Sequence, residues 1–215
     1  MPELRTAWYQ VLETETDFET AREWYTKRSG MFLERYRNMV AMGSMAIDPW
    51  TLGFFMALLE VCRPSLICET GTGASSIFIE HWASYDYTQC IHTEQDKQWL
   101  KTLRPIAKAF GLELSVVLSY EDFWKQLHSP YVALVDSKDK PDDIAHFSQY
   151  PNGVVLIRGA DSPDVQEAAR FYMESGTLYG LQSLTRDDYG HYAWLWIGPE
   201  FQFPDIKRDL WWRIK

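Results

Sequence analysis

Hydrophobic residues along the chain form short continuous runs that alternate with segments of helical spacing. Each run is typical of a buried strand, and each segment that follows repeats apolar residues every three or four positions. Strands are expected at 65–68, 89–93, 112–118, 131–135 and 153–157. Helices are expected at 75–82, 97–110, 121–127, 142–147 and 163–175. This alternation predicts an α/β fold with a doubly wound parallel sheet and right-handed crossovers.

The two ends of the chain depart from this alternation. Runs at 178–184 and 192–197 resemble strands, but too few residues separate them for a crossover helix. We therefore expect an antiparallel hairpin at the end of a sheet of about seven strands. Before the first strand, the pattern predicts one helix or a helix pair at 17–39, with Gly30 as a candidate break. A further helix is expected to begin at Asp48 and Pro49 and to end at Cys62.

The length of 215 residues suits one domain, and no stretch rich in glycine, serine or proline divides the chain. We expect a helical N-terminal extension or lid at 1–48 and an α/β domain at 49–199. The remaining segment, 200–215, is an aromatic tail. It is apolar enough to pack on its own domain or to form a contact in a homodimer.

Composition and charge narrow the class of partner. The chain is 46% hydrophobic and carries a formal net charge of −9, so its field opposes nucleic acid and anionic membranes. It shows no signal peptide and no apolar run long enough to span a membrane. Its cysteines, Cys62, Cys68 and Cys90, have no metal-ligand spacing, and their odd number gives no disulfide framework. A soluble protein of the reducing cytoplasm is therefore expected.

The most informative local feature is the turn Glu69-Thr70-Gly71-Thr72-Gly73-Ala74-Ser75, between the first strand and its helix. Its two glycines permit turn geometries closed to other residues and let a ligand approach the backbone. The helix that follows offers free N–H groups. A tight strand-to-helix turn with no ligand is the plainer interpretation of the same residues.

Together with its strand, 66–75 resembles motif I of class I S-adenosylmethionine-dependent methyltransferases. The resemblance implies a Rossmann-like fold with S-adenosylmethionine as the cofactor, bound by the turn residues Gly71, Thr72, Gly73 and Ser75. Glu69 would lie near the methionine ammonium group, directly or through water. Such an acidic residue also suits a cationic ligand better than a pyrophosphate.

Two further strand ends carry candidate contacts to an adenosine ligand. Glu94 follows the second strand and is placed to accept hydrogen bonds from a ribose diol, as it would also be in a dehydrogenase. After the third strand, Tyr120 or Phe123 could stack on adenine. Asp122 or Glu121 could accept from the adenine amino group. A capping box formed by Ser119 and Asp122 explains this last segment equally well.

The fourth strand end, with Asp136 and Lys138, resembles more closely the catechol O-methyltransferase-like group. The resemblance implies a metal ligand at Asp136, which we also expect to contact the cofactor. It implies a catalytic base near Lys138, although that lysine is one residue early and Lys140 is one residue late. A solvated loop is the alternative.

The fifth strand departs from the same group. Arg158 and Gly159 stand where the group has Asp-Asn, and an arginine cannot ligate Mg²⁺. Asp161 is three residues away, so no metal is expected. Arg158 could instead clamp an anionic substrate group, or form a salt bridge to Asp136 or Asp161.

Three functions remain open. The first is a metal-independent O- or N-methyltransferase of a small molecule, possible catalytic residues being Lys138, Asp136 and Arg158. The second is a binding or decoy protein that keeps the fold and has lost catalysis. The third is a nicotinamide-dependent oxidoreductase, which Glu69 and the terminal hairpin disfavour. His191, in the hairpin loop, is a candidate acid or base, although loop histidines are more often structural.

Overall fold

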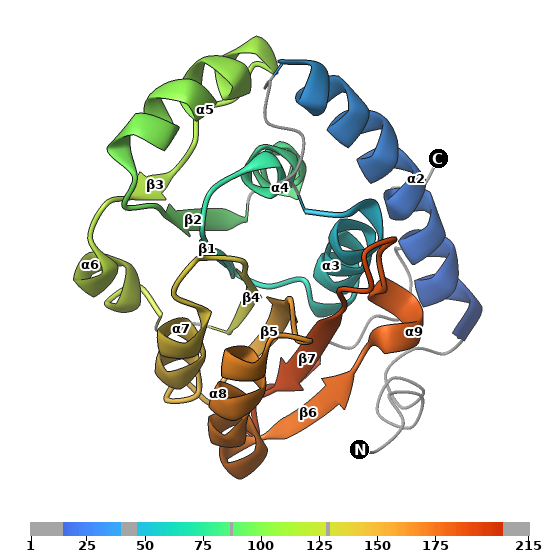
Figure 1. Ribbon diagram of the computed structural model, residues 1–215, viewed down its shortest axis with the longest axis vertical. Helices are drawn as coiled ribbons and strands as arrows, with labels where there is room; N and C mark the ends of the chain where they lie inside the picture. Colours follow the sequence, from blue (N-terminus) through green and yellow to red (C-terminus); the bar gives the residue numbers. More distant parts are fainter. Residues whose placement is uncertain (1–14, 40–46, 87, 128–129, 204–215) are drawn as a thin grey trace.

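A seven-stranded sheet runs through the centre of the molecule (Figure 1). The computed structural model describes residues 15–39, 47–86, 88–127 and 130–203. The strands in chain order are β1 (Leu66–Thr70), β2 (Gln89–Thr93), β3 (Val116–Val117), β4 (Tyr131–Val135), β5 (Gly153–Arg158), β6 (Thr177–Gly180) and β7 (Ala193–Ile197). Their order in the sheet is β3-β2-β1-β4-β5-β7-β6, and β1 to β5 are parallel. The strand order reverses between β1 and β4, and in such sheets ligands bind beyond the carboxyl ends of the strands at this point.

Helices cover both faces of the sheet (Figure 1). One face packs against α2 (Glu15–Met39), α3 (Pro49–Cys62), α4 (Ala74–Asp86) and α5 (Lys97–Ala109). The other face packs against α6 (Tyr120–Trp124), α7 (Lys140–Phe147) and α8 (Pro163–Ser175). The alternating side chains of the buried strands divide between two apolar cores, as expected for a doubly wound sheet.

The end of the sheet confirms the antiparallel hairpin but corrects its bounds. β7 pairs antiparallel with both β5 and β6. The strand expected to continue to residue 184 ends at Gly180, and a short helix, α9 (Gln182–Thr185), follows. The hydroxyl of Thr185 donates to the Leu181 carbonyl and accepts from the Ala193 amide, so side-chain bonds replace further strand pairing.

The N-terminal segment forms one helix, the first of the two expected alternatives, and not a helix pair. α2 is continuous through Gly30, because a helix packed against a partner tolerates the small cost of one interior glycine. Its apolar side chains join the core of α3. At Gly53, in α3, an added Cβ would lie 2.6 Å from the backbone nitrogen of Thr26, so the missing side chain permits the close approach of the two helices.

The third strand is shorter than expected. Only Val116 and Val117 pair, with His92 and Thr93 of β2, and the Leu112 amide instead donates to Ala107 in the turn that ends α5. The apolar pattern at 112–118 therefore reflects packing of a loop as well as of a strand. Among the described helices, none is both long and apolar enough to cross a membrane.

Candidate functional site

A cavity of about 530 Å³ lies at the carboxyl ends of β1, β2 and β4. Its walls come from the glycine turn, from the segments that follow β2 and β4, and from α2 and α6. The lining residues are Tyr36, Ile47, Gly71, Thr72, Gly73, Ala74, Ser75, Thr93, Glu94, Gln95, Asp96, Trp99, Tyr120, Asp136, Ser137, Lys138 and Asp139. The strand ends thus bring together most of the residues expected to hold a cofactor. Two of those residues, Glu69 and Asp122, are not among the lining residues.

Gly71 packs directly against the segment that follows β4. Its φ is +83°, a conformation that favours glycine. A Cβ there would lie 2.8 Å from the carbonyl oxygen of Asp136 and 2.9 Å from the Cα of Ser137. The Gly71 amide donates to the Thr93 carbonyl, and the Asp136 amide donates to the Thr70 carbonyl. The turn is therefore hydrogen-bonded to both neighbouring strands.

Gly73 differs from the expectation that both glycines serve the turn geometry. It has no positive φ, and a Cβ built on it meets no described atom within 4 Å. Its amide donates to the Ser76 hydroxyl. Because Gly73 lines the cavity, its missing side chain leaves space on the ligand side of the turn.

Glu69 lies beneath the turn, fully buried. Its Oε2 accepts from the Ser76 hydroxyl at 2.5 Å and lies 2.7 Å from Nδ1 of His92. Its other oxygen, Oε1, has no hydrogen-bond partner among the described residues. Tyr36, which lines the cavity, lies near this carboxylate: burial, together with the charge of Glu69, raises the pKa of Tyr36 to about 12. Glu69 thus offers one unsatisfied acceptor at the rear of the site.

Glu94 closes the turn from the side of β2. Its Oε2 accepts from the amide and hydroxyl of Thr72, and its Oε1 accepts from the amide of Asp96. The indole of Trp99 donates to the Thr72 carbonyl at 2.8 Å. Each carboxylate oxygen can accept more than one hydrogen bond, so Glu94 can hold the loop and still accept from a diol in the cavity.

The segment after β3 was expected either to contact adenine or to cap a helix. Tyr120 lines the cavity, whereas Asp122 is exposed, with a carboxylate oxygen 3.6 Å from Nζ of Lys125. The Asp122 amide donates to Oγ of Ser119 at 3.4 Å, and Phe123 is fully buried. The segment is thus a helix start capped by Ser119, as one of the two interpretations expected, and of Tyr120 and Asp122 only Tyr120 lines the cavity.

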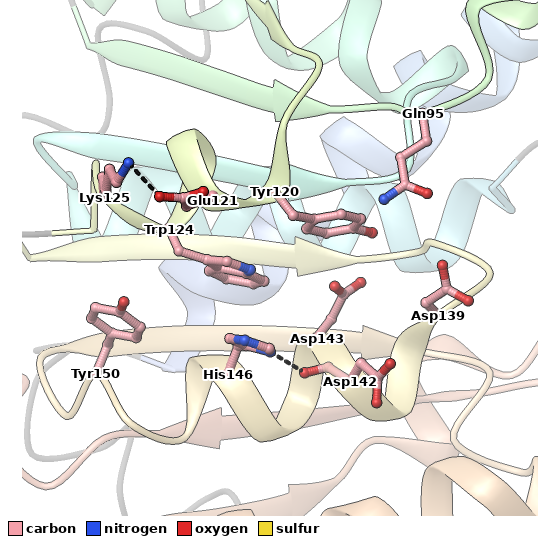
Figure 2. Close-up of a pocket in the computed structure, with 10 residues that line it drawn as sticks. All are labelled: Gln95, Tyr120, Glu121, Trp124, Lys125, Asp139, Asp142, Asp143, His146 and Tyr150. Atoms are coloured by element: carbon pink, nitrogen blue, oxygen red, sulfur yellow. Dashed lines mark hydrogen bonds and ion pairs between the residues drawn. The ribbon is translucent and has the colours of Figure 1, made fainter.

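Beside Tyr120, a second cavity of about 580 Å³ lies between α6 and α7, and Figure 2 shows the side chains around it. It shares Gln95, Tyr120 and Asp139 with the first cavity. The remaining lining residues are Glu121, Trp124, Lys125, Asp142, Asp143, His146 and Tyr150. The indole of Trp124 stacks on the imidazole of His146, with ring centroids 4.8 Å apart. This wall is therefore aromatic and acidic.

Asp136 pairs with Arg158 rather than facing an open metal position. Nη1 of Arg158 lies 3.0 Å from Oδ2 and 3.2 Å from Oδ1 of Asp136, and Nε lies 4.0 Å from Asp48. Burial lowers the pKa of Arg158, but the charges of Asp136 and Asp48 outweigh it and raise the pKa above its ordinary value. Arg158 was expected either to clamp an anionic substrate group or to form a salt bridge, and in the structure it forms the salt bridge to Asp136. A guanidinium on this carboxylate does not fit a divalent metal.

The two lysines after β4 differ in their surroundings. Nζ of Lys140 donates to the Ser137 carbonyl at 2.8 Å and lies 3.4 Å from Asp136. Lys138 is exposed, lines the cavity and has no ion pair with the described residues. Of the two candidate bases, Lys138 is therefore the one that can reach into the cavity. His191 is not among the residues that line the cavity, and its Nδ1 lies 2.8 Å from Oδ2 of Asp161.

Several residues of the site carry no motif that marks them in the sequence. Tyr36 and Ile47 come from the N-terminal part of the chain, and Trp99 comes from the first turn of α5. His92 is fully buried between Glu69 and Glu80, although the strand pattern alone makes it an ordinary inward-facing residue. Glu69 and Ser76, which bond to each other, lie seven residues apart on either side of the glycines, Glu69 on β1 and Ser76 in the first turn of α4.

Comparison with solved structures agrees with the architecture of the sheet. No protein-family model and no curated protein matches the chain. Solved structures of O-methyltransferases match it over most of its length, and its mostly parallel sheet with antiparallel end strands is consistent with their fold. The chain has the class I methyltransferase fold. An S-adenosylmethionine-dependent O-methyltransferase from Thermotoga maritima matches at a TM-score of 0.61 and 14% identity, over 80% of this chain and 72% of that one.

Two further O-methyltransferase structures match over most of both chains. One from Bacillus cereus, in complex with S-adenosylhomocysteine, has a TM-score of 0.57 and 17% identity, over 77% of this chain and 89% of that one. One from Streptomyces achromogenes, involved in tomaymycin synthesis and in complex with S-adenosylmethionine, has a TM-score of 0.56 and 19% identity. That match covers 91% of this chain and 96% of the other. At sequence identities below 20%, these matches show a shared fold and do not by themselves show a shared activity.

Proposed function

We propose that this protein is a metal-independent methyltransferase that binds S-adenosylmethionine in the cavity beside the glycine turn and acts on a small molecule. The observation that carries the proposal is the buried Glu69 carboxylate, whose Oε1 has no hydrogen-bond partner among the described residues. A buried acceptor without a partner is costly, and a cationic ammonium group placed at this position would satisfy it.

The other walls of the cavity fit the remaining parts of such a cofactor. Glu94 would accept hydrogen bonds from the ribose hydroxyls, and Tyr120 would pack against the adenine ring. Thr72 and Ser75 would contact the cofactor from the turn, with Gly71 holding the backbone and Gly73 leaving space. Asp136 would lie near the cofactor from the β4 side.

When bound, the cofactor supplies an electrophilic methyl group on a sulfonium. The residues on the β4 side would hold the acceptor in line with that methyl, so that alignment supplies most of the rate enhancement. Lys138 is the candidate to take a proton from the acceptor, since it lines the cavity and Lys140 is engaged with Ser137. Asp136 and Arg158 would then act as one ion pair that shapes the acceptor side, with an anionic acceptor group drawn toward Arg158.

The test is calorimetric titration of the protein with S-adenosylmethionine, S-adenosylhomocysteine and NAD. We expect binding of both adenosyl compounds and none of NAD. Glu94→Gln should weaken the affinity at least about 10-fold, because each charged hydrogen bond contributes about 1.5–3 kcal/mol. Glu113→Gln is the matched control, since Glu113 is exposed and lies outside the cavity. The proposal would be overturned if the protein bound neither S-adenosylmethionine nor S-adenosylhomocysteine.

A binding or decoy protein without catalysis is a second candidate, favoured by the Arg158–Asp136 pair at the acceptor side. The two functions share the cofactor cavity and differ in turnover. Transfer of labelled methyl from S-adenosylmethionine to a panel of anionic phenols and carboxylates, in the presence of a chelator, distinguishes them. Turnover that Lys138→Met reduces supports the enzyme, and binding without turnover supports the decoy.

The proposal also covers where the protein acts and which partners it has. The described cysteines are all free and buried, which fits a reducing cytoplasm. The net charge of −9 makes nucleic acid and anionic membranes poor partners. A homodimer contact through the apolar tail remains part of the proposal, and that tail lies outside the described residues from 204 onward.

A further inference from the structure

A cluster of three metal-ligating residue types lies on the far side of Glu69 from the cavity. Cys90 and His92 are two residues apart on β2, so their side chains point to the same face of the sheet. Glu80 faces them from α4, one helical turn after Ser76, which bonds to Glu69. One potential ligand atom from each of the three lies within 4.8 Å of the other two.

One ring nitrogen of His92 is bonded to Glu69, and the other faces the cluster. Its Nδ1 lies 2.7 Å from Oε2 of Glu69. Its Nε2 is fully buried, faces Glu80 and has no hydrogen-bond partner among the described residues. Nε2 lies 3.3 Å from Oε1 of Glu80. Two ligands about 2.0–2.1 Å from a tetrahedral metal stand roughly 3.3 Å apart, which is the separation observed.

We propose that Glu80, Cys90 and His92 form a binding site for Zn²⁺, separate from the cavity of the proposed methyl transfer. The combination of carboxylate, thiolate and imidazole favours zinc, whereas Mg²⁺ and Ca²⁺ prefer oxygen ligands alone. Binding releases the thiol proton of Cys90, and any proton on Nε2 of His92, to solvent. A water molecule completes the coordination, since three protein ligands leave one tetrahedral position.

The surroundings of the three ligands match those of protein zinc sites. Histidine ligands of zinc usually donate their second ring nitrogen to a carboxylate, and Glu69 occupies that position. The ligating carboxylate is itself held, because Oε1 of Glu80 accepts from the Ser115 amide at 2.7 Å. Glu80 is half-buried, with 12% of its side chain exposed, which gives the ion a path from solvent. A sulfur and a nitrogen bound to one tetrahedral zinc lie about 3.5 Å apart, so the separation of at most 4.8 Å in the ligand set shortens by no more than about 1.3 Å on binding.

Zinc would fix two elements and one functional side chain. The ion links α4 to β2, and through His92 it orients the buried carboxylate of Glu69. The site therefore acts as a structural clamp behind the glycine turn. Because it does not depend on what the cavity binds, it can be tested without any knowledge of the methyl acceptor.

The experiment uses full-length protein purified without a polyhistidine tag, stripped with chelator and titrated with Co²⁺ and then Zn²⁺. We expect a thiolate-to-cobalt charge-transfer absorption that Zn²⁺ abolishes, and a rise in Tm on adding Zn²⁺. Cys90→Ser should remove the absorption and weaken zinc binding more than about 100-fold, since loss of an outer-shell partner alone costs 10–100-fold. Cys68→Ser, at a fully buried cysteine on the neighbouring strand β1, is the matched control and should keep both signals.

Glu80→Gln provides a second variant, because this half-buried helix position tolerates the change even if Cys90→Ser fails to fold. We expect at least a 10-fold loss of zinc affinity with the charge-transfer absorption retained. Two results overturn the proposal. One is wild-type protein that shows no charge-transfer absorption with Co²⁺ and no change of Tm with Zn²⁺. The other is an absorption that persists unchanged in Cys90→Ser.

Discussion

Gly71 and Gly73 are two residues apart in the turn but serve different purposes. A side chain at Gly71 would collide with the backbone of Asp136 and Ser137, whereas one at Gly73 would enter open space on the cavity side. We therefore expect stability to depend on Gly71 and the proposed cofactor binding to depend on Gly73.

The pair gives a prediction with its own control. Gly71→Ala should destabilise the protein by about 2–4 kcal/mol, because a left-handed φ and a backbone contact both oppose the methyl group. Gly73→Ala should leave the denaturation midpoint nearly unchanged and weaken S-adenosylhomocysteine binding at least about 10-fold. Urea denaturation and calorimetry measure the two effects. Equal loss of stability in both variants would contradict this assignment.

Asp143 gives a second prediction at the scale of one residue. It is 1% exposed, and its carboxylate accepts from the Ser137 hydroxyl at 2.5 Å. Burial raises the pKa of Asp143 to about 6, an effect that the bond from Ser137 only partly offsets. Figure 2 shows the side chain between α7 and Tyr120.

A folded-state pKa above the unfolded one means that the folded protein binds the proton more tightly between about pH 4 and pH 6. Stability from this group is therefore present at low pH and lost as the pH rises through 6. Relative to Asp143→Asn, the wild type should lose up to about 3 kcal/mol over that range, at 1.4 kcal/mol per pH unit. Asp142→Asn, at the exposed neighbour, should show no such trend. Chemical denaturation at several pH values tests it.

At the scale of elements, Arg158 joins three parts of the fold. It ends β5, pairs with Asp136 after β4 and approaches Asp48 before α3. Both carboxylates are largely buried, and removal of the guanidinium leaves Asp136 with the Lys140 ammonium, 3.4 Å away, as its one cationic partner among the described residues.

Arg158→Asp tests how this pair relates to a metal. The variant places three carboxylates together, and we expect it to be destabilised by about 3–5 kcal/mol in chelator. Added Mg²⁺ should raise the Tm of the variant and leave the wild type unchanged, because only the variant presents an all-oxygen site. Arg158→Met separates the two effects, since it loses the pair without adding a ligand. A Mg²⁺ response in the wild type would show that Arg158 does not block a metal.

Sequence pattern predicted the elements better than their edges. The central strands β4 and β5 are continuous apolar runs bounded by turns, and their bounds match the expectation to within one residue, whereas β1 ends two residues later than expected, at Thr70. Tertiary contacts decide the points that the pattern left open or missed. Packing on α3 offsets the cost of Gly30, so α2 is one helix and not a pair. Residues 181–185 leave the expected strand, because the side chain of Thr185 bonds to Leu181 and Ala193.

The residues of the candidate site could be predicted where polar or aromatic side chains follow the carboxyl end of a strand. Glu94, Tyr120, Asp136 and Lys138 all line one cavity, because parallel strands deliver their carboxyl ends to one edge. Side-chain direction was not predictable, which is why Asp122 was expected inside and lies outside. The network of Glu69, His92 and Glu80 depends on register between β1, β2 and α4, which no local pattern encodes.

At the scale of the whole molecule, binding at the cavity should stabilise every element that meets there. A ligand at 100 times its Kd adds about 2.7 kcal/mol to the free energy of unfolding. For a chain of this size we expect S-adenosylhomocysteine to raise Tm by about 5–10 °C and NAD to leave it unchanged. Differential scanning fluorimetry measures both. A flat response to S-adenosylhomocysteine at saturating concentration would contradict the proposed cofactor.

The contact at Gly71 has a consequence for how this molecule can change. At Gly71 the turn after β1 packs directly on the backbone of the segment after β4, with no side chain between them. A displacement of one backbone therefore cannot be absorbed by rearranging a side chain. A substitution that moves the segment after β4 would therefore shift the glycine turn by a similar distance. If the proposed methyl transfer occurs here, we expect new acceptors to be accommodated most easily by changes remote from this junction, such as those on α2, because these changes leave the distance between donor and acceptor intact.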